Sequence, residues 1–549
     1  MTQKTIPPNW QYYLLILLAW MVTRAYPLIT MEPSLDWQVW ESKKLLEYGF
    51  SERQGGIINF HFMTGRVADP EKFNYVNHPY PILWLDTLAY YTAGEWGPIV
   101  FTSFLGLLSC LAVLPALSTF LPTRESFAGA LLYTLAPSSI FFNVNANTVS
   151  LGAIIWPFAI LFIGRQLHHK SPGSYLPLGV IAFLGGQISW FTYTVMPALL
   201  STCLGLNYER GKGFNINPGR KTAAALLIGG LATAMVFAAQ VIHYTHDMAA
   251  DIAYFHGQAG AQEGVSTAKM YLAIGLRAVM SVGPSLALGA LLWMALRLRS
   301  GSLRWYELSA LLYLVTFALS SLILRRFFFR EIHMYQYLVF PCTVLTMASL
   351  HSLGRPLWTR LTLLLALVAV SYPMIKSSIP MASQTTRTLG RYIAEISKPT
   401  DVIATNLESR RPPFASWDVG SIELLNVFSD RLIREGIGTR KAIDALPSNF
   451  KSNELDVVFL YNPALPIDPS FLEDLQNIST PDSHRFQIPD EPATFGTSLR
   501  NFYWKLSGRH QLSQNETTAG KETEAQIDIF RIRLVKDAST AVTLLPATK

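Results

Sequence analysis

Asp36 and a cluster of arginines between residues 325 and 330 are the side chains with the most distinctive chemistry in this chain of 549 residues. Transfer of a group from a phosphate ester to a hydroxyl needs a base beside the attacking oxygen. It also needs cations beside the departing phosphate. Asp36 has the chemistry of such a base, and Arg325, Arg326 and Arg330 can hold a phosphate through charge-assisted hydrogen bonds. Glu32 is a second, weaker acidic candidate.

Both sites also have a simpler interpretation. A helix is predicted to start just after Asp36, and an Asp at this position can cap its first backbone N–H groups. The arginines stand beside three phenylalanines in the run 324–333, LRRFFFREIH, and that pattern also suits anchoring at lipid headgroups. Capping and catalysis by Asp36 are compatible, and both readings of each site stay open at this point.

Two further residues are candidates for substrate contact. His78 lies in the run Asn77-His78-Pro79-Tyr80-Pro81, whose prolines fix an extended approach to the next segment. It can contact substrate or simply be a loop residue at the membrane interface. Arg277 lies within an apolar run, and a charge inside the membrane marks a functional candidate, here a second phosphate partner.

Metal and nucleotide chemistry have little support in the sequence. His243 and Asp247 would share a helix face with His246 close by, and that spacing can hold a metal. No recognised metal motif is matched, so a solvated helix end is the default interpretation. No Walker A loop, GxGxxG, HExxH or supported GxSxG motif is present. We therefore expect no cofactor, and a donor that arrives already activated on a lipid.

Composition indicates what must position these residues. Half of the chain is hydrophobic and 15% is charged, against about 25% in soluble proteins. Repeated apolar runs match the bilayer thickness and predict membrane-spanning helices. Eleven spans are predicted, at 11–30, 97–121, 126–142, 148–164, 175–187, 189–206, 222–244, 270–296, 306–324, 334–350 and 361–375. The net charge of +7 comes largely from short loops between spans, which favours orientation signals over nucleic-acid binding.

The loop charges predict the orientation of the chain in a cell (inner) membrane. Two spans rather than one within 175–206 place the Lys/Arg clusters of the loops on one side, as the positive-inside bias requires. Gly185-Gly186-Gln187 and Pro197 favour that break. The N-terminus is then cytoplasmic, and the acidic loop 31–96 and everything after Tyr372 are outside. The arginines at 325–330 also fall outside, where no orientation signal is needed.

The predicted fold class is an all-α polytopic membrane domain, residues 1–376, followed by a small extracytoplasmic α/β domain, residues 377–549. The segment TTRTLGRYIAEISK reads as an amphipathic helix, and DVIATN, ELDVVFLYNP and AQIDIFRIRLV read as strands. The three cysteines all lie in apolar runs, which predicts small core residues rather than disulfides.

The stretch from Leu14 to about Gly164 resembles the GT-C superfamily of membrane glycosyltransferases, in the branch of protein O-mannosyltransferases and aminoarabinose transferases. The family shows an acidic pair after its first helix, and Leu35-Asp36-Trp37 stands at that place. His78 to Trp84 corresponds to its proline-rich lead into an aromatic segment. The run 330–341, REIHMYQYLVFP, resembles its basic and aromatic approach to a late helix and adds His333 and Tyr335 as candidate contacts. Trp37 and Asn147 depart from the family pattern.

The resemblance implies a polyprenyl-phosphate sugar donor and an inverting, single-displacement transfer without nucleotide or obligatory metal. Asp36 would be the catalytic base, the acceptor would be a glycan, lipid or protein hydroxyl, and membrane lipids would surround the spans. One alternative is a transporter or flippase of a lipid-linked sugar, which would share the spans and the basic outer site. Another is a non-catalytic assembly partner, which the departures at Trp37 and Asn147 favour.

Overall fold

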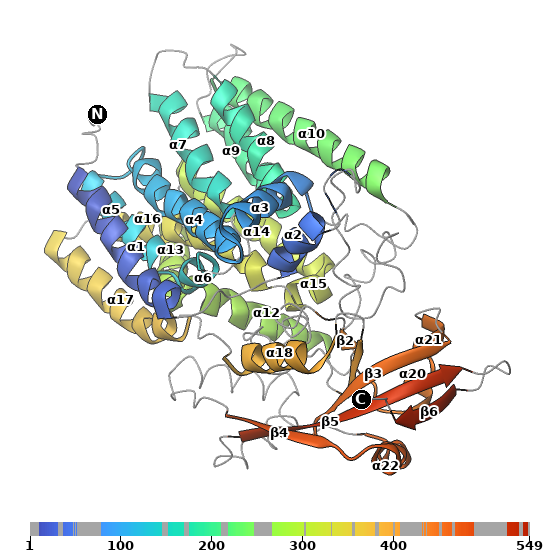
Figure 1. Ribbon diagram of the computed structural model, residues 1–549. Helices are drawn as coiled ribbons and strands as arrows, with labels where there is room; N and C mark the ends of the chain where they lie inside the picture. Colours follow the sequence, from blue (N-terminus) through green and yellow to red (C-terminus); the bar gives the residue numbers. More distant parts are fainter. Residues whose placement is uncertain are drawn as a thin grey trace. The chain divides into compact units, whose positions relative to one another are not determined.

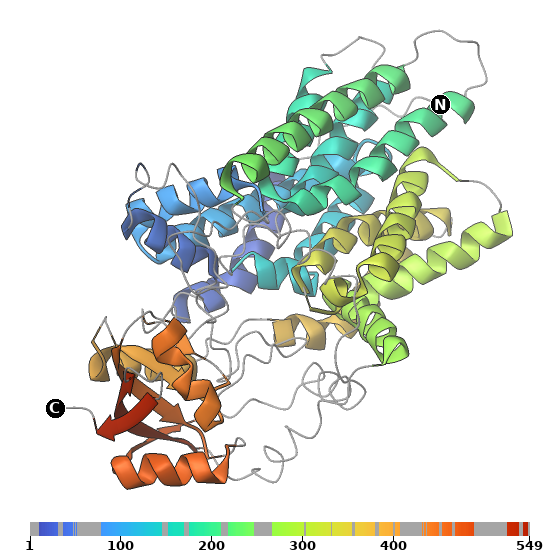
Figure 2. The same cartoon turned by 90° about the vertical axis from the view of Figure 1, so that its right-hand side faces the viewer.

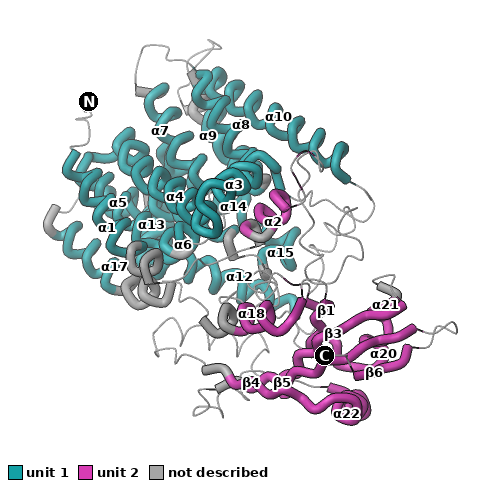
Figure 3. The backbone as a smooth tube through the Cα atoms, in the orientation of Figure 1, with its two compact units in different colours: residues 1–34, 76–381, 493–508 teal, residues 35–75, 382–492, 509–549 magenta. Residues whose placement is uncertain are grey.

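The structure is a computed structural model, and we describe the parts of the chain whose placement it defines. These are residues 10–30, 37–47, 49, 51, 78–144, 152–168, 175–209, 218–245, 266–300, 303–330, 332–353, 357–378, 384–398, 401–406, 431, 433–434, 436–449, 453–463, 467–487, 524–536 and 542–546. Within them the chain forms two compact units, shown in two colours in Figure 3.

The two units are not continuous in sequence. The first unit comprises residues 1–34, 76–381 and 493–508, and the second comprises 35–75, 382–492 and 509–549. Part of the predicted outer loop, residues 35–75, is therefore grouped with the C-terminal segment, whereas the sequence analysis assigned the whole loop 31–96 to the membrane domain. The predicted domain boundaries, 1–376 and 377–549, and the roles of the two domains stay predictions.

The first unit is a bundle of helices (Figure 1), and Figure 2 shows it from a second side. Its helices are α1 (Trp10–Thr30), α3 (Tyr80–Ala93), α4 (Trp96–Leu117), α5 (Thr123–Thr134), α6 (Pro137–Phe142), α7 (Ile155–His168), α8 (Leu176–Ile188), η3 (Trp190–Thr194), α9 (Met196–Glu209), α10 (Pro218–Tyr244), α12 (Thr267–Val282), α13 (Pro284–Ser300), α14 (Trp305–Ile323), α15 (Arg325–Arg330), η4 (Ile332–Leu338), α16 (Val339–Ser352) and α17 (Leu357–Ser378). The three cysteines are buried and free, as predicted.

Three of the described helices are long and apolar enough to cross a membrane, namely α4, α10 and α14. A fourth span results if the bent pair α12–α13 counts as one. Most of the eleven predicted spans have a helix at their position, but many of these helices are shorter. The predicted break within 175–206 is present, since α8 ends at Ile188 and α9 begins at Met196. The count of eleven stays a prediction.

The predicted single span 270–296 is wrong as one continuous helix. α12 and α13 meet at an angle of 106°. Gly283 takes a positive φ of 87° at the junction, a conformation that glycine adopts without the Cβ clash. Pro284 then begins α13, where its missing N–H would have had no helical partner. Arg277 therefore lies on a helix that turns sharply away from the axis of α13.

Close helix packing in the first unit depends on glycines. A Cβ added to Gly229 on α10 would lie 2.1 Å from the carbonyl oxygen of Gly179 on α8. A Cβ on Gly186 would lie 2.4 Å from the methyl group of Thr233. These contacts show that α8 and α10 run parallel, with backbones as close as small residues permit in membrane helix pairs.

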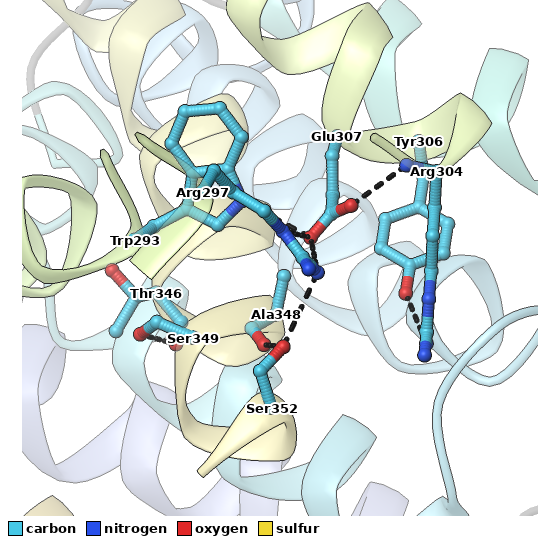
Figure 4. A network of polar contacts seen from close by, with 9 residues as sticks. All are labelled: Trp293, Arg297, Arg304, Tyr306, Glu307, Thr346, Ala348, Ser349 and Ser352. Carbon is cyan, nitrogen blue, oxygen red and sulfur yellow. Dashed lines mark hydrogen bonds and ion pairs between the residues drawn. The ribbon is translucent and has the colours of Figure 1, made fainter. Parts of the chain in front are cut away.

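A buried carboxylate, Glu307 at the start of α14, joins three helices (Figure 4). Its Oε1 accepts hydrogen bonds from Trp293 Nε1 at 3.0 Å and from Arg297 Nε at 2.9 Å, both on α13. Its Oε2 accepts from the backbone N–H of Arg304 at 2.8 Å. Arg297 also donates to the hydroxyl of Ser352 at the end of α16, at 3.2 Å. The Glu307 network thus ties the end of α13 and the end of α16 to the start of α14.

A second buried carboxylate, Glu125 on α5, forms a similar junction. Its Oε2 lies 2.8 Å from Nδ1 of His351 near the end of α16, and its Oε1 pairs with Arg360 on α17. Arg297, Arg304 and Arg360 come from loops or loop ends that the charge pattern predicts on one side of the membrane. The two networks show that these regions meet at one end of the first unit.

We expect Glu307→Gln to lower the free energy of unfolding by about 1.5–3 kcal/mol, because hydrogen bonds to a charged group contribute about that much. The side chain keeps its size but loses the charge that Arg297 faces. The measurement is the apparent thermal midpoint of the purified protein in detergent. Glu95→Gln is the matched control, since Glu95 is exposed and a surface change of this kind costs at most about 0.5 kcal/mol. Equal midpoints for the two variants would contradict the prediction.

The second unit is built on a mixed sheet. Its elements are α2 (Trp37–Glu47), α18 (Gln384–Ile396), β1 (Val402–Thr405), β2 (Ile433–Arg434), α20 (Arg440–Asp444), α21 (Leu446–Asn449), β3 (Glu454–Tyr461), α22 (Pro469–Ile478), β4 (Asp482–Gln487), β5 (Glu524–Lys536) and β6 (Val542–Pro546). The strand order is β2-β1-β3-β5-β4, with β6 also paired to β5. The amphipathic helix and all three predicted strands are present.

The parallel part of the sheet is buried on both faces, as expected for parallel strands. β1 pairs parallel with β2 and β3, with Ile403 opposite Ile433 and Val458. These three residues pack with Leu389 and Ile393 of α18 on one face. Side chains of α20, α21 and α22 pack on the other face, against β1, β3, β5 and β6.

Candidate active site

The predicted phosphate-binding arginines lie on a short helix, α15, between α14 and the 3₁₀-helix η4. Arg325 and Arg326 open α15 and are partly exposed. Arg330 is its last residue. The side chains of Arg330 and His333 lie outside the description. The backbone from Arg325 to Arg330 thus forms a short helix of fewer than two turns.

The carbonyl oxygen of Phe328 is the point where three elements meet. Arg277 on α12 donates to it from Nη1 at 3.3 Å. Tyr335 on η4 donates to it from Oη at 2.6 Å. Arg277 is 1% exposed and Tyr335 is fully buried. Two of the predicted site residues therefore contact the backbone of the helix that carries the arginine cluster.

The ring of Phe328 fixes the same helix from its apolar side. It is fully buried and makes edge contacts with Phe191 of η3 and Phe317 of α14, at centroid distances of 5.7 and 4.9 Å. Aromatic pairs in this geometry contribute about 0.5–1.5 kcal/mol each beyond their buried area. The position of α15 is thus set by both the side chain and the backbone of one residue.

The α15 segment lies at the end of the bundle opposite the Glu307 network. α14 starts beside Glu307 and ends just before α15, and α16 returns from η4 to Ser352 in that network. With about 1.5 Å per residue, the 19 residues of α14 span about 28 Å, close to the hydrocarbon thickness of a bilayer, about 30 Å. The α15 helix and the Glu307 network therefore lie at opposite ends of α14. Which side of the membrane each end faces stays a prediction.

His78 is held through its backbone. Its carbonyl accepts a hydrogen bond from Gln240 Nε2 of α10 at 2.7 Å. Gln240 Oε1 in turn accepts from the backbone N–H of Tyr80 at 2.7 Å. The ring of Tyr80 also contacts Tyr244, with centroids 4.7 Å apart. One buried amide on α10 therefore fixes the start of α3 and the half-buried His78 beside it.

Several predicted site residues lie outside the described part of the chain. These are Glu32, Asp36, His246 and Asp247, together with the departure from the family pattern at Asn147. The described part of helix α2 begins at Trp37. Their roles stay predictions.

Of the three metal candidates, only His243 lies in the described part of the chain. His243 is exposed near the end of α10. In the part of the chain that the structure describes, no three His, Cys, Asp or Glu side chains come together in a way that could hold a metal ion.

Several buried charged residues were missed in the sequence analysis, among them Arg24 and Asp86. Arg24 on α1 is fully buried, and its guanidinium donates from Nη2 to the carbonyl of Thr134 at 2.9 Å and from Nη1 to the hydroxyl of Thr23 at 2.6 Å. Asp86 on α3 is also fully buried. The available signal was the charge itself, since Arg24 lies inside the first apolar run and such residues are costly there.

Comparisons of sequence alone find no match, neither to a protein-family model nor to a curated protein. Comparison of structures does. The chain is similar to ArnT from Cupriavidus metallidurans bound to undecaprenyl phosphate, with a TM-score of 0.54 and 10% identity. The match covers 95% of this chain and 98% of ArnT.

A second similarity is to an oligosaccharyltransferase from Archaeoglobus fulgidus. Its apo form matches with a TM-score of 0.51 and 10% identity, over 98% of this chain and 94% of that one. AglB from the same organism, in complex with an inhibitory peptide and a dolichol-phosphate, matches with a TM-score of 0.50 and 9% identity, over 98% and 94% of the two chains.

ArnT and AglB are both GT-C glycosyltransferases. The chain therefore has the GT-C fold, as the sequence resemblance predicted. The similarity extends over nearly the full length of both chains, so it includes both the helical bundle and the smaller unit.

Proposed function

We propose that this protein is an integral membrane glycosyltransferase that moves a sugar from a polyprenyl-phosphate donor to an acceptor hydroxyl, with inversion, on the outer face of the membrane. The GT-C fold over 95% of the chain carries the proposal. Its support is the helix α15, whose three arginines form a cationic segment at the end of α14 away from the Glu307 network. The two similar proteins were solved with undecaprenyl phosphate and a dolichol-phosphate, which supports a lipid phosphate as the donor group.

The proposed reaction is a single displacement. The acceptor hydroxyl loses its proton to Asp36 as its oxygen attacks the anomeric carbon. The bond between that carbon and the phosphate oxygen breaks, and the phosphate leaves with the electron pair. Arg325, Arg326 and Arg330 hold the departing phosphate and balance its charge. The apolar tail of the donor lies between helices of the first unit.

The test is donor consumption by the purified protein in liposomes. A panel of undecaprenyl-phosphate sugars is offered together with a membrane extract as the source of acceptors, and lipids are followed by mass spectrometry. We expect undecaprenyl phosphate to accumulate from at least one donor, without added nucleotide. If every donor stays intact under these conditions, the enzyme proposal is wrong.

A transporter or flippase of lipid-linked sugars is the second candidate, and the bend between α12 and α13 is the observation that favours it. Broken helices occur at the binding sites of many transporters. A flippase would move the intact lipid-linked sugar between leaflets. The same liposomes separate the two, because transport without release of undecaprenyl phosphate would favour this candidate.

We propose the topology that the loop charges predict, with the N-terminus in the cytoplasm and the C-terminal segment outside. A reporter that is active only in the cytoplasm is fused after residue 380. We expect no reporter activity there, and full activity when the same reporter is fused to the N-terminus. An active fusion at residue 380 would show that the orientation is reversed or that the number of spans is even.

A further inference from the structure

Helix α15 is too short to satisfy its own carbonyl groups. An α-helix leaves its last four carbonyls without partners inside the helix, and α15 has six residues. Phe328 is one of the last four. Its carbonyl accepts hydrogen bonds from two side chains outside α15, the Arg277 guanidinium and the Tyr335 hydroxyl. Cationic side chains at a helix C-terminus also stabilise its negative dipole end.

These two donors come from different directions. Arg277 reaches the carbonyl from α12, and Tyr335 reaches it from η4. Both side chains are buried, at 1% and 0% exposure. A carbonyl held by two buried donors cannot turn without breaking one of them. The backbone of the capped helix is therefore held against rotation, and the points at which the Arg325 and Arg326 side chains leave it are held with it.

We infer that Arg277 and Tyr335 are positioning residues, which cap the C-terminal end of α15 and hold its arginines in the geometry that a lipid phosphate requires. This inference rests on the proposed function. It gives Arg277 a different role from the direct phosphate contact that the sequence suggested. Pre-organised donors bind and stabilise charge better than donors that must first be ordered.

The test measures the affinity of the purified full-length protein for undecaprenyl phosphate in detergent. Tyr335→Phe keeps the ring and removes one hydrogen bond, so affinity should fall about 3- to 10-fold. Tyr337→Phe is the matched control, because Tyr337 is an equally buried tyrosine of the same 3₁₀-helix whose hydroxyl is paired with Ser189 and Thr192 and not with α15. We expect its affinity to stay within about twofold of wild type. Equal affinities for Tyr335→Phe and wild type would overturn the inference.

A double-mutant cycle separates positioning from direct contact for Arg277. Arg277→Met should weaken binding roughly 10- to 100-fold in the wild-type background, and Arg277→Lys should restore part of the loss because Lys still donates. In an Arg325→Ala/Arg326→Ala background, Arg277→Met should change affinity by less than about twofold, because there is nothing left to position. An undiminished effect in that background would mean that Arg277 contacts the phosphate itself.

The same cycle distinguishes failure of the inference from failure of the proposed function. If the Arg325→Ala/Arg326→Ala protein binds undecaprenyl phosphate like wild type, the phosphate site lies elsewhere and the positioning role is wrong, whereas the proposed function fails only if no donor is consumed in the liposome assay. If that protein loses affinity while Tyr335→Phe and Arg277→Met do not, the arginine site stands and only the positioning role is wrong.

Discussion

Asp36→Asn should lower turnover by about 10²-fold or more, because a positioned general base contributes at least that factor. Binding of the lipid-phosphate donor should change little, since the carboxylate is assigned to the acceptor proton and not to the phosphate. The measurement is the initial rate of sugar transfer, or of undecaprenyl phosphate release, by the protein in liposomes.

The choice of asparagine separates catalysis from capping. Asn and Asp are about equally good at the N-cap of a helix, so Asp36→Asn would preserve a cap at the start of α2. Glu47→Gln is the matched control, since it removes an exposed carboxylate from the other end of α2, where Glu47 pairs with Lys44 at 2.7 Å. Turnover like that of wild type in a folded Asp36→Asn protein would leave capping as the only role of this residue.

Replacing Arg325, Arg326 and Arg330 together by Ala should abolish measurable binding of the lipid phosphate. Each lost charge-assisted hydrogen bond costs about 1.5–3 kcal/mol, and every 1.4 kcal/mol is a factor of ten in affinity. A single substitution that removes one such contact should weaken binding roughly 10- to 100-fold. Lysine should rescue it only in part, because it lacks the planar fork of the guanidinium.

The control for the arginine cluster uses a cation from the other end of the bundle. Arg304 lies beside Glu307, and its side chain donates to the Tyr306 hydroxyl at 2.9 Å, so Arg304→Ala should leave donor affinity unchanged. If the triple variant binds undecaprenyl phosphate normally, the cluster is only a headgroup anchor. The phosphate site would then lie elsewhere, with Arg277 as the next candidate.

The helices could be predicted where the apolar runs are long and uniform. α1, α4, α10 and α14 fall where hydropathy places them, because burial in lipid depends on local composition. The break between α12 and α13 was missed, although Gly283-Pro284 is a recognised helix stop and start. Hydropathy averaged over the run hid that signal.

The candidate site could be predicted only in part. Three arginines on the side predicted to be opposite the basic loops were a local signal, and the structure places their helix at the end of α14 away from the Glu307 network. The capping of the Phe328 carbonyl was not predictable, because Arg277 and Phe328 are 51 residues apart. Pairings over such distances depend on how whole helices pack. The strand order of the second unit was hidden for the same reason, since β1 pairs with β2 and with β3 across long connections.

The burial and pairing of charged residues could not be predicted from the sequence for a different reason. Glu307 and Glu125 each stand near the start of a helix, where an acidic residue is unremarkable on helix-dipole grounds alone. Only the fold shows that both carboxylates are buried and paired with arginines from other helices. Arg24 was detectable as a charge in an apolar run, but its partner, the carbonyl of Thr134, was not.

The most direct test of the proposed function is an experimental structure of the wild-type protein with undecaprenyl phosphate. We expect the phosphate within hydrogen-bonding distance, about 2.7–3.2 Å, of at least two of Arg325, Arg326 and Arg330. Its tail should lie between helices of the first unit, and Asp36 should face the side of the phosphate where the sugar is attached. A lipid phosphate bound instead at the basic loops near the Glu307 network, with α15 empty, would contradict the proposed donor site.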